Sequence, residues 1–348
     1  MLTREVALYK QMLQKGVNIT FVTYGDKSDL LFAETIPGIT VCCNRWGLSP
    51  RRYERWLHYL HWRYFRRADL IKTNQINGAD TALGVARRFH KPLVARCGYM
   101  WSKNLLIEQG EESRLAQQSL AVEKEVFISA QHIIVTSREM KASLAERFSG
   151  INRKISIVPN YVDTKLFRPD DGKGKNKKRI CFIGRLAPEK NIEALLTAIE
   201  DLDIELDIIG DGPLRKQLTV KAAGNPRVYF HGRIPHEQLP NYLHRCALFV
   251  FPSLYEGHPK TPLEAMSCGL PVVGTDVSGV REVVRDGRTG VLCGPDPRSI
   301  RETLQKVLGD TVFREKLGAA AREFVVQYFS LEKIVKQEME VYRLVLGK

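Results

Sequence analysis

The second half of the chain alternates short apolar runs with amphipathic segments, and this alternation limits the possible folds more than any other feature. The apolar runs are continuous, as in strands that are buried on both faces of a sheet. The segment between two of them, residues 191–201, places Ile192, Leu195 and Ile199 at helical spacing. Strands are expected at residues 179–183, 205–209, 227–230, 247–251, 271–273 and 290–292. The pattern predicts an α/β domain of the Rossmann type, with a parallel sheet between two layers of helices.

The first half shows the same alternation less regularly. Strands are expected at residues 19–23, 39–41, 70–72, 92–95, 132–135 and 155–158. A helical pattern at residues 5–15 precedes the first of them, whereas a doubly wound domain usually opens with a strand and a Gly-rich turn. We therefore expect a second Rossmann-like domain that lacks its first strand.

Length and linker composition suggest how the chain is divided. At about 150 residues per domain, 348 residues fit two domains. The polar, Gly- and Lys-rich run at 170–178 has the composition of a linker. We predict an N-terminal domain at 1–165, a linker at 166–178, a C-terminal domain at 179–326, and a final helix at 327–348 that packs back on the N-terminal domain. The two domains are expected to face one another, with ligands in the cleft at the carboxyl ends of their strands.

Charge and cysteine content narrow the class of protein. The net charge of +14 favours a phosphate-bearing partner without selecting one. Seven cysteines without a Cys-x-x-Cys pair argue against both a disulfide framework and a zinc site. No apolar run is long enough for a membrane span, and charged residues interrupt the N-terminal segment where a signal peptide would be apolar. A cytoplasmic protein without a metal site is expected.

Two segments that follow expected strands carry candidate ligand-binding residues. Gly184 permits an unusual turn after residues 179–183, and Arg185 and Lys190 in the same segment suit a diphosphate, although they could also be solvated surface cations. Glu256 lies in a Gly- and Pro-rich loop after residues 247–251, where a carboxylate can bind ligand hydroxyls. Glu264 has a purely structural alternative, because Thr261, Pro262 and Glu264 match an N-cap, a first-turn proline and a capping box.

The glycines of the turn Gly210-Asp211-Gly212-Pro213 also allow two interpretations. They could let a backbone or a ligand approach closely, or they could form an ordinary turn before a helix that starts at Pro213. Residues 269–275, a glycine leading into a buried strand, are interpreted as structural.

An ordered series of motifs carries a family resemblance. The series comprises Val158–Asp163, Gly184–Asn191, the Glu256/Glu264 pair with its Glu-Gly-x-Pro start, Glu264–Val273, Ser278–Glu282 and Asp286-Gly287-x-Thr289-Gly290. Together they resemble the retaining glycosyltransferases of family four, the glycogen-synthase-like glycosyl transferases group 1 of the GT-B fold. The resemblance covers residues 130–310 well and the rest loosely.

The resemblance implies that the C-terminal domain holds a nucleotide-diphospho-sugar. Arg185 and Lys190 would pair with the diphosphate and stabilise the leaving group without a metal. Glu256, the third implied catalytic residue, would bind sugar hydroxyls, and Glu264 the ribose hydroxyls. The other implied donor-binding residues are Gly184 in the turn before Arg185, Arg233 and Ile234 near the base, and His258, Pro259, Lys260 and Thr261 beside the sugar and phosphate. No cofactor besides the donor substrate is implied.

Two departures from the family pattern concern the acceptor. The opening strand with its Gly-Gly turn is missing, which suggests a truncated or inactive product. Where the family often has a histidine, this chain has Arg96-Cys97-Gly98-Tyr99, and Arg96 or Tyr99 is hypothesised to replace it.

Residues 45–67 hold three of the four tryptophans and seven arginines. On one continuous helix, Arg52, Arg55, Tyr59, Arg63 and Arg66 would share a face. This pattern favours an interfacial helix on an anionic membrane. The alternatives are a helix that packs its aromatic rings on the first domain, and nucleic-acid binding, which no recognised motif supports.

We therefore expect a retaining glycosyltransferase that moves a hexose or N-acetylhexosamine to a polysaccharide or lipid-linked acceptor. It would act in polysaccharide or lipopolysaccharide biosynthesis, in the cytoplasm or peripherally on the inner face of the cell membrane. The alternatives are an inactive or truncated sugar-nucleotide-binding homologue and a nucleotide-sugar epimerase on the same fold.

Overall fold

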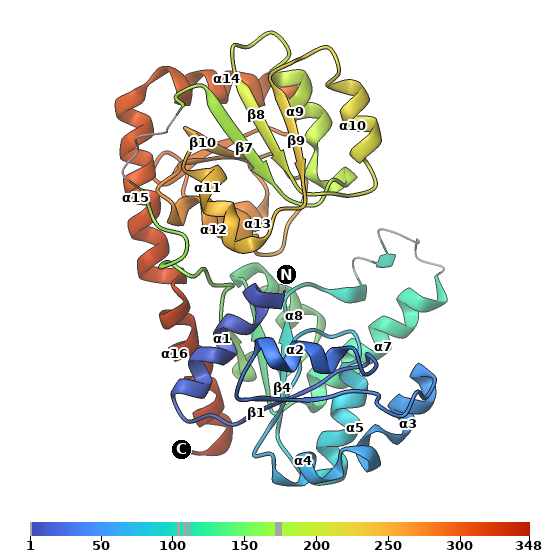
Figure 1. The fold of residues 1–348 in the computed structure, drawn as a ribbon. Coiled ribbons are helices and arrows are strands. Elements are labelled where there is room, and N and C mark those ends of the chain that lie inside the picture. Colours follow the sequence, from blue (N-terminus) through green and yellow to red (C-terminus); the bar gives the residue numbers. More distant parts are fainter. Residues whose placement is uncertain (1, 103–104, 107–109, 111–112, 171–175) are drawn as a thin grey trace. The chain divides into compact units, whose positions relative to one another are not determined.

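The computed structural model describes residues 2–102, 105–106, 110, 113–170 and 176–348 (Figure 1). These residues form two units: one comprises residues 159–334, and the other combines residues 2–158 with 335–348. The division falls at residue 159, whereas the linker was expected at 166–178, and residues 171–175 of that linker lie outside the described residues.

The unit of residues 159–334 is built on one six-stranded parallel sheet of order β12-β11-β10-β7-β8-β9. The chain first adds β8 and β9 on one side of β7, then returns to add β10, β11 and β12 on the other, so the strand order reverses between β7 and β10. This is the doubly wound order predicted from the sequence. The strands are β7 (Arg179–Ile183), β8 (Glu205–Ile209), β9 (Val228–Gly232), β10 (Leu248–Phe251), β11 (Val272–Thr275) and β12 (Gly290–Cys293).

Helices cover this sheet and enclose its core. Phe182, Phe249 and Phe251 are almost completely buried, and their rings stack at centroid distances of 6.1–6.4 Å. The continuous apolar strands therefore meet helices on both faces, as expected. The helical segments are η2 (Pro188–Lys190), α9 (Ile192–Ala198), α10 (Arg215–Lys221), η3 (His236–Gln238), α11 (Leu239–Leu243), α12 (Lys260–Ser267), α13 (Ser278–Arg281), α14 (Pro297–Gly309) and α15 (Thr311–Phe329).

The other unit contains two parallel sheets instead of the single one that the sequence pattern predicted. One pairs β1 (Ile19–Val22) with β2 (Ile39–Cys42); the other has the order β3-β4-β5-β6. The first described element is the helix α1, which precedes β1. The remaining elements are α1 (Leu2–Gln14), α2 (Asp29–Thr35), α3 (Pro50–Leu60), α4 (Trp62–Arg67), β3 (Ile71–Lys72), α5 (Ala79–Phe89), β4 (Leu93–Cys97), α7 (Arg114–Ser129), β5 (His132–Val135), α8 (Arg138–Arg147), η1 (Asn152–Lys154), β6 (Ile155–Ile157) and α16 (Leu331–Leu346).

A buried ionic cluster joins α16 to this second unit. Glu338 is 1% exposed, and its carboxylate lies 2.5 Å from Lys72 Nζ and 3.3 Å from Arg96 Nη1. Tyr342 donates a hydrogen bond of 2.6 Å to the same carboxylate, and Lys72 donates one of 2.7 Å to the Tyr9 hydroxyl. Burial alone would raise the pKa of Glu338, but the charges of Lys72 and Arg96 outweigh burial and lower it. The last helix is thus held by charges on β3 and β4.

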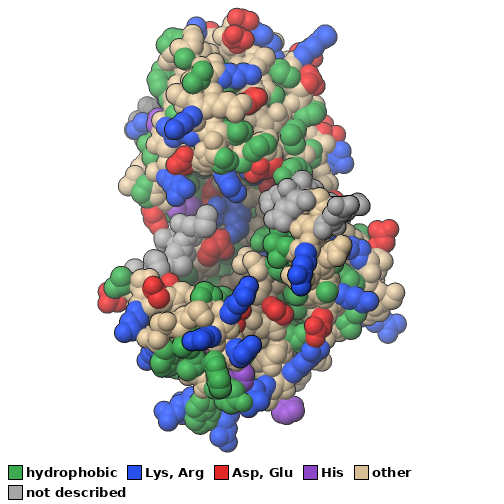
Figure 2. Space-filling model, turned by 90° about the vertical axis from the view of Figure 1, so that its right-hand side faces the viewer, with side chains coloured by type: hydrophobic (Ala, Val, Ile, Leu, Met, Phe, Trp, Pro, Cys, Tyr) green, Lys and Arg blue, Asp and Glu red, His purple; other side chains and the backbone are tan. Residues whose placement is uncertain are grey.

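The basic, aromatic segment forms two helices, so the expectation of one continuous helix was wrong. The break is His61, which has φ −115° and ψ 20° and is buried, with Nε2 2.8 Å from the Tyr53 hydroxyl. This inward contact interrupts the helix between α3 and α4. In Figure 2 hydrophobic and basic side chains gather at the lower end of the view, on the unit that contains these two helices.

Among the described residues, none of the helices combines the length and the apolar character needed to cross a membrane.

Candidate functional site

The reversal of strand order brings two loops together at the carboxyl end of the sheet. Residues 180 and 181 of β7 pair with 248 and 249 of β10, so the two strands end level with one another. Their following loops, 184–191 and 252–259, are joined by a 2.8 Å hydrogen bond from the amide of Leu254 to the carbonyl of Glu189. In doubly wound sheets this point of reversal is where ligands bind.

Lys190 and Glu256, one from each loop, form an ion pair there. Their side chains are 17% and 14% exposed, and Lys190 Nζ lies 5.7 Å from the ring centroid of Phe251 at the end of β10. Two residues that are 66 positions apart in sequence thus meet at the strand ends. At this point the ammonium group of Lys190 can bind an anion, and the carboxylate of Glu256 can accept hydrogen bonds from hydroxyl groups.

Two glycines allow the close packing that shapes these loops. Gly210 has φ +133°, and a Cβ there would lie 1.9 Å from the carbonyl oxygen of Gly184. The backbone of the turn after β8 therefore packs directly against the backbone of the turn after β7. Of the two interpretations of residues 210–213, this supports the close approach of another backbone segment. A Cβ on Gly279 in α13 would likewise lie 2.2 Å from the carbonyl oxygen of Glu256. Larger residues at either position would displace the loops that carry the ion pair.

Glu264 does not cap its helix, so that structural interpretation is wrong. Helix α12 begins at Lys260, with Pro259 at the N-cap position and no side-chain capping bond, which places Glu264 in the second turn. Its carboxylate is almost completely buried, and Oε1 lies 2.8 Å from His236 Nε2. The His236 ring in turn lies 5.0 Å from the ring of Phe167.

His236 was missed from the sequence. It lies on η3, directly after the segment 232–234 that the resemblance assigned to the base, and that position was the only available signal. Its partner is 28 residues away along the chain, so no local pattern joins them.

The remaining predicted residues fall into an exposed and a buried group. Arg185 is exposed, and no ion pair or hydrogen bond of its guanidinium is found within the described part of the chain. Arg233 is 84% exposed, with Nε 3.8 Å from a carboxylate oxygen of Asp211, while Ile234 packs against the core. His258 is buried, its carbonyl accepts a 2.7 Å hydrogen bond from Asn160 Nδ2, and its ring lies 5.5 Å from that of Phe329.

Three further predicted residues surround the start of α12. Pro259 is buried, whereas Lys260 and Thr261 are half-buried in the first turn, whose amides lack partners within the helix. Helix N-termini bind anions, so this first turn is suited to a phosphate group. The structure thus pairs Lys190 with Glu256 and Glu264 with His236, and leaves Arg185 and Arg233 at the surface.

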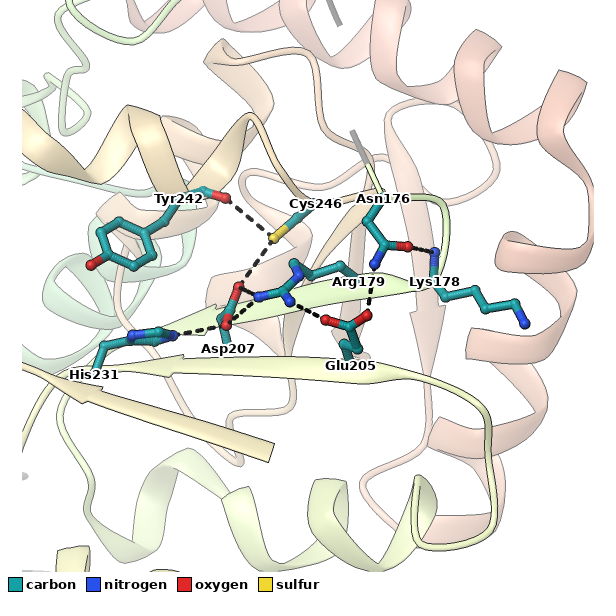
Figure 3. A network of polar contacts seen from close by, with 8 residues as sticks. All are labelled: Asn176, Lys178, Arg179, Glu205, Asp207, His231, Tyr242 and Cys246. Carbon is teal, nitrogen blue, oxygen red and sulfur yellow. Dashed lines mark hydrogen bonds and ion pairs between the residues drawn. The ribbon is translucent and has the colours of Figure 1, made fainter. Parts of the chain in front are cut away.

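A second polar cluster begins at the opposite end of the sheet (Figure 3). Arg179, the first residue of β7, donates two 3.0 Å hydrogen bonds to the buried carboxylate of Asp207 on β8 and forms an ion pair with Glu205. Asp207 also lies 2.8 Å from His231 Nε2 on β9. These contacts join three adjacent strands, and they satisfy a buried carboxylate, so we interpret this cluster as structural.

Comparison with known families identifies the chain. Residues 163–324 match the model of the glycosyl transferases group 1, and residues 6–166 match the model of glycosyltransferase family 4. The two matches together span residues 6–324. The chain belongs to the glycosyltransferases, with a family 4 region followed by a group 1 region. The family resemblance inferred from the sequence motifs is thereby confirmed.

Relatives of this glycosyltransferase include two curated proteins. An uncharacterized glycosyltransferase of Methanocaldococcus jannaschii is 32% identical over 217 residues, which cover 62% of this chain and 60% of that protein. The chain thus spans less than two thirds of that relative. The alpha-maltose-1-phosphate synthase of Mycolicibacterium smegmatis is 26% identical over 259 residues, covering 66% of this chain and 67% of the synthase.

Solved structures support the fold of this glycosyltransferase. Sucrose-phosphate synthase from Thermosynechococcus elongatus superposes with a TM-score of 0.80 at 23% identity, over 98% of this chain and 92% of that one. Anabaena HepE in complex with UDP and glucose superposes with a TM-score of 0.79 at 19% identity, over 98% and 95% of the two chains. The likeness confirms the predicted α/β fold of the GT-B class.

Proposed function

We propose that the protein is a retaining glycosyltransferase that uses a nucleotide-diphospho-sugar and transfers a hexose or N-acetylhexosamine. The observation that carries the proposal is the Lys190–Glu256 pair at the reversal of strand order. That point of a doubly wound sheet binds ligands, and the pair offers a cation for a diphosphate and a carboxylate for sugar hydroxyls. Crystal structures of Anabaena HepE in complex with UDP and glucose, and with UDP-glucose, support a donor of this chemical class.

Lys190 is the proposed main ligand of the departing diphosphate. Its ion pair with Glu256 holds the ammonium group at the end of the strands, where the diphosphate is proposed to bind. Arg185 adds a second, exposed cation, and the amides of His258, Lys260 and Thr261 add donors at the start of α12, beside Pro259. Positive charge that is aimed at the leaving group in advance lowers the barrier to its departure.

Glu264 is proposed to bind the ribose hydroxyls, and Arg233 and Ile234 to lie near the base. The contact between Glu264 and His236 supports this role, because it holds a buried carboxylate in one orientation. The exposed Arg233 and the partly buried Ile234 offer a polar and an apolar surface in the same turn.

The proposed chemistry is a same-face displacement. The bond between the anomeric carbon and the diphosphate oxygen breaks through an oxocarbenium-like transition state, and the acceptor oxygen bonds to the same face of that carbon. The acceptor proton passes to the departing phosphate oxygen, so no side-chain base is required. The cations and amides of the site provide the positive charge, and the proposal therefore includes neither a metal nor a cofactor.

The acceptor is proposed to be a polysaccharide or a lipid-linked glycan in polysaccharide or lipopolysaccharide assembly, with the enzyme peripheral on the inner face of the cell membrane. Of the two residues that could replace the family histidine, contacts favour Tyr99. Arg96 is occupied by Glu338 and by the carbonyl of Val158, whereas Tyr99 is 41% exposed and donates a long, 3.4 Å hydrogen bond to Gln75. Burial raises the pKa of the Tyr99 phenol, so it stays a neutral hydrogen-bond donor.

The direct test is the release of nucleoside diphosphate with and without acceptor. A transferase releases the diphosphate and joins the sugar to the acceptor. An epimerase converts the donor without an acceptor, and an inactive homologue binds the donor without turnover. Either of these two results would contradict the proposal.

The ion pair gives the corresponding prediction from mutation. Lys190→Ala and Glu256→Ala should each lower the transfer rate by about 10²-fold or more, because each removes a group that acts on the transition state. Lys178→Ala is the matched control, since Lys178 forms an ion pair with Asp203 in the same unit but at the amino end of the sheet. Transfer rates of the two site variants that equal the control rate would remove the basis of the assignment.

A further inference from the structure

Residues 45–67 expose three tryptophans and two tyrosines together with arginines, while Tyr53 and Phe65 of the same segment are buried. We propose that this surface docks the protein on an anionic lipid surface. The basic aromatic surface consists of Arg45, Trp46, Arg51, Arg52, Arg55, Trp56, Tyr59, Trp62, Arg63, Tyr64, Arg66 and Arg67, together with Arg88 from α5. Only the role of this docking, which is to bring the enzyme to a membrane-linked acceptor, rests on the proposed function.

The two helices are attached to the protein along one side only. Tyr53, Leu57, His61 and Phe65 are at most 6% exposed, and each follows the last by four residues. This row packs against Val85 of α5 and its neighbours. The other sides of α3 and α4 face away from the core, so the segment keeps its fold without burying the basic aromatic surface.

All three tryptophans of the segment lie outside that buried row. Trp46, Trp56 and Trp62 are 45%, 51% and 44% exposed, and Tyr59 is 49% exposed. The interpretation in which the aromatic rings pack on the first domain is therefore wrong for the tryptophans and Tyr59, although it holds for Tyr53 and Phe65. Large exposed rings grouped in one segment indicate a surface that binds something, and tryptophan and tyrosine are enriched at the level of lipid headgroups.

Arginines are stacked on these rings. The guanidinium of Arg88 lies 4.7 Å from the ring centroid of Tyr59, that of Arg63 lies 5.6 Å from the ring of Trp62, and the rings of Trp56 and Tyr59 are 5.5 Å apart. A guanidinium that stacks through its face keeps its N–H groups at the edge for phosphate. Aromatic rings and the N–H groups that can bind phosphate thus lie side by side. Both kinds of group bind at the level of lipid headgroups.

The charge of the surface is left uncompensated. Residues 45–67 contain seven arginines against one acidic residue, Glu54, and within the described parts of the chain none of these arginines forms an ion pair with a carboxylate. An uncompensated cationic surface is complementary to anionic headgroups, where each Arg strengthens binding by about fivefold. Single-stranded nucleic acid would use the same groups, and competition with an oligonucleotide separates the two.

Vesicle co-sedimentation tests the proposal without donor or acceptor. The full chain is mixed with vesicles of phosphatidylcholine alone, or of phosphatidylcholine with phosphatidylglycerol. We expect sedimentation only with the anionic vesicles, and weaker sedimentation as salt is added, because salt screens exposed charges.

Exposed residues allow variants that leave the core intact. Arg52→Gln combined with Arg55→Gln should weaken vesicle binding by about 25-fold, the product of two fivefold losses. Trp56→Ser combined with Trp62→Ser should weaken it by at least about tenfold through lost apolar contact. Lys216→Gln combined with Lys221→Gln on α10 removes two exposed charges from the other unit and should leave binding unchanged.

Three results would overturn the proposal. They are no binding to anionic vesicles at low salt, equal losses in the arginine and control variants, and displacement of the protein from vesicles by a single-stranded oligonucleotide that binds more tightly. Because the assay contains no sugar donor, each of these results would leave transfer to a water-soluble acceptor unaffected. The inference and the proposed transfer reaction can therefore fail separately, whereas the proposed peripheral location would fail with the inference.

Discussion

At the scale of single residues, the candidate site consists of pairs whose members come from different loops. Lys190 was expected from the sequence because it lies just before a helix that follows a strand, and Glu256 because it follows another strand. His236 was not expected, because its only distinguishing feature is the contact with Glu264 in the folded chain. The capping interpretation of Glu264 was wrong for the same reason. Residues 261–264 match a capping box locally, but the carboxylate of Glu264 contacts His236, which is 28 residues away along the chain.

His236 provides a test at this scale. His236→Ala removes the hydrogen-bond partner of a buried carboxylate, a loss of about 1–3 kcal/mol, so the KM for the donor should rise by about tenfold while kcat changes little. His236→Gln, which can still donate a hydrogen bond, should recover part of the loss. His244→Gln is the control, because His244 contacts the carbonyl of Arg168 in the same unit. A KM in His236→Ala equal to that of the unaltered protein would show that His236 does not position Glu264 for the donor.

At the scale of elements, the sequence predicts strands better than it predicts helix ends. The predicted strands 179–183 and 205–209 coincide with β7 and β8, because a strand that is buried on both faces is mostly apolar and carries a polar residue such as Asp207 only where partners satisfy it. Helix limits depend on contacts elsewhere. Helix α12 starts at Lys260 and not after Thr261, and the segment 50–67 breaks at His61, which turns inward toward Tyr53.

Helix α16 gives a prediction about stability. Glu338→Ala would leave Lys72 and Arg96 buried without their carboxylate, a loss of about 3–5 kcal/mol in the free energy of unfolding. Urea unfolding measures this as a lower midpoint. Glu340→Ala changes an exposed residue of the same helix and should shift the free energy of unfolding by no more than about 0.5 kcal/mol.

The same cluster predicts a dependence on pH. Because the folded state lowers the pKa of Glu338, its stabilising contribution is complete above the ordinary glutamate value of about 4.3. The contribution is lost as the pH falls from there through the lowered pKa. The stability difference between the unaltered protein and Glu338→Ala should therefore shrink below about pH 4. A difference that stays constant down to about pH 2 would contradict the ionic origin of the contact.

At the scale of the whole molecule, donor binding should be measurable as thermal stabilisation. A ligand at about 100 times its Kd adds about 2.7 kcal/mol to the stability of the folded state, which corresponds to a rise in Tm of several degrees. A screen of nucleotide sugars should find at least one such donor, and Lys190→Ala should reduce its effect. Absence of any shift across the screen would contradict a donor site in residues 159–334.

The two-unit organisation was only partly predictable. Alternating strands and helices indicate two α/β domains, but the split of the N-terminal sheet into β1-β2 and β3-β4-β5-β6 has no local signature, because pairing depends on which strands meet. The return of residues 335–348 to the unit of residues 2–158 was suggested by the terminal helical pattern, while the contacts of Glu338 that hold it there became visible only in the structure.

That return has a consequence for biosynthesis. The N-terminus of a chain leaves the ribosome first, and domains generally fold as they emerge. Here the half of the protein that is made first contains two cations, Lys72 and Arg96, whose counter-charge, Glu338, arrives only when the last helix leaves the exit tunnel. Translation that stops before Val335 would thus yield a complete later half attached to an earlier half that cannot finish folding.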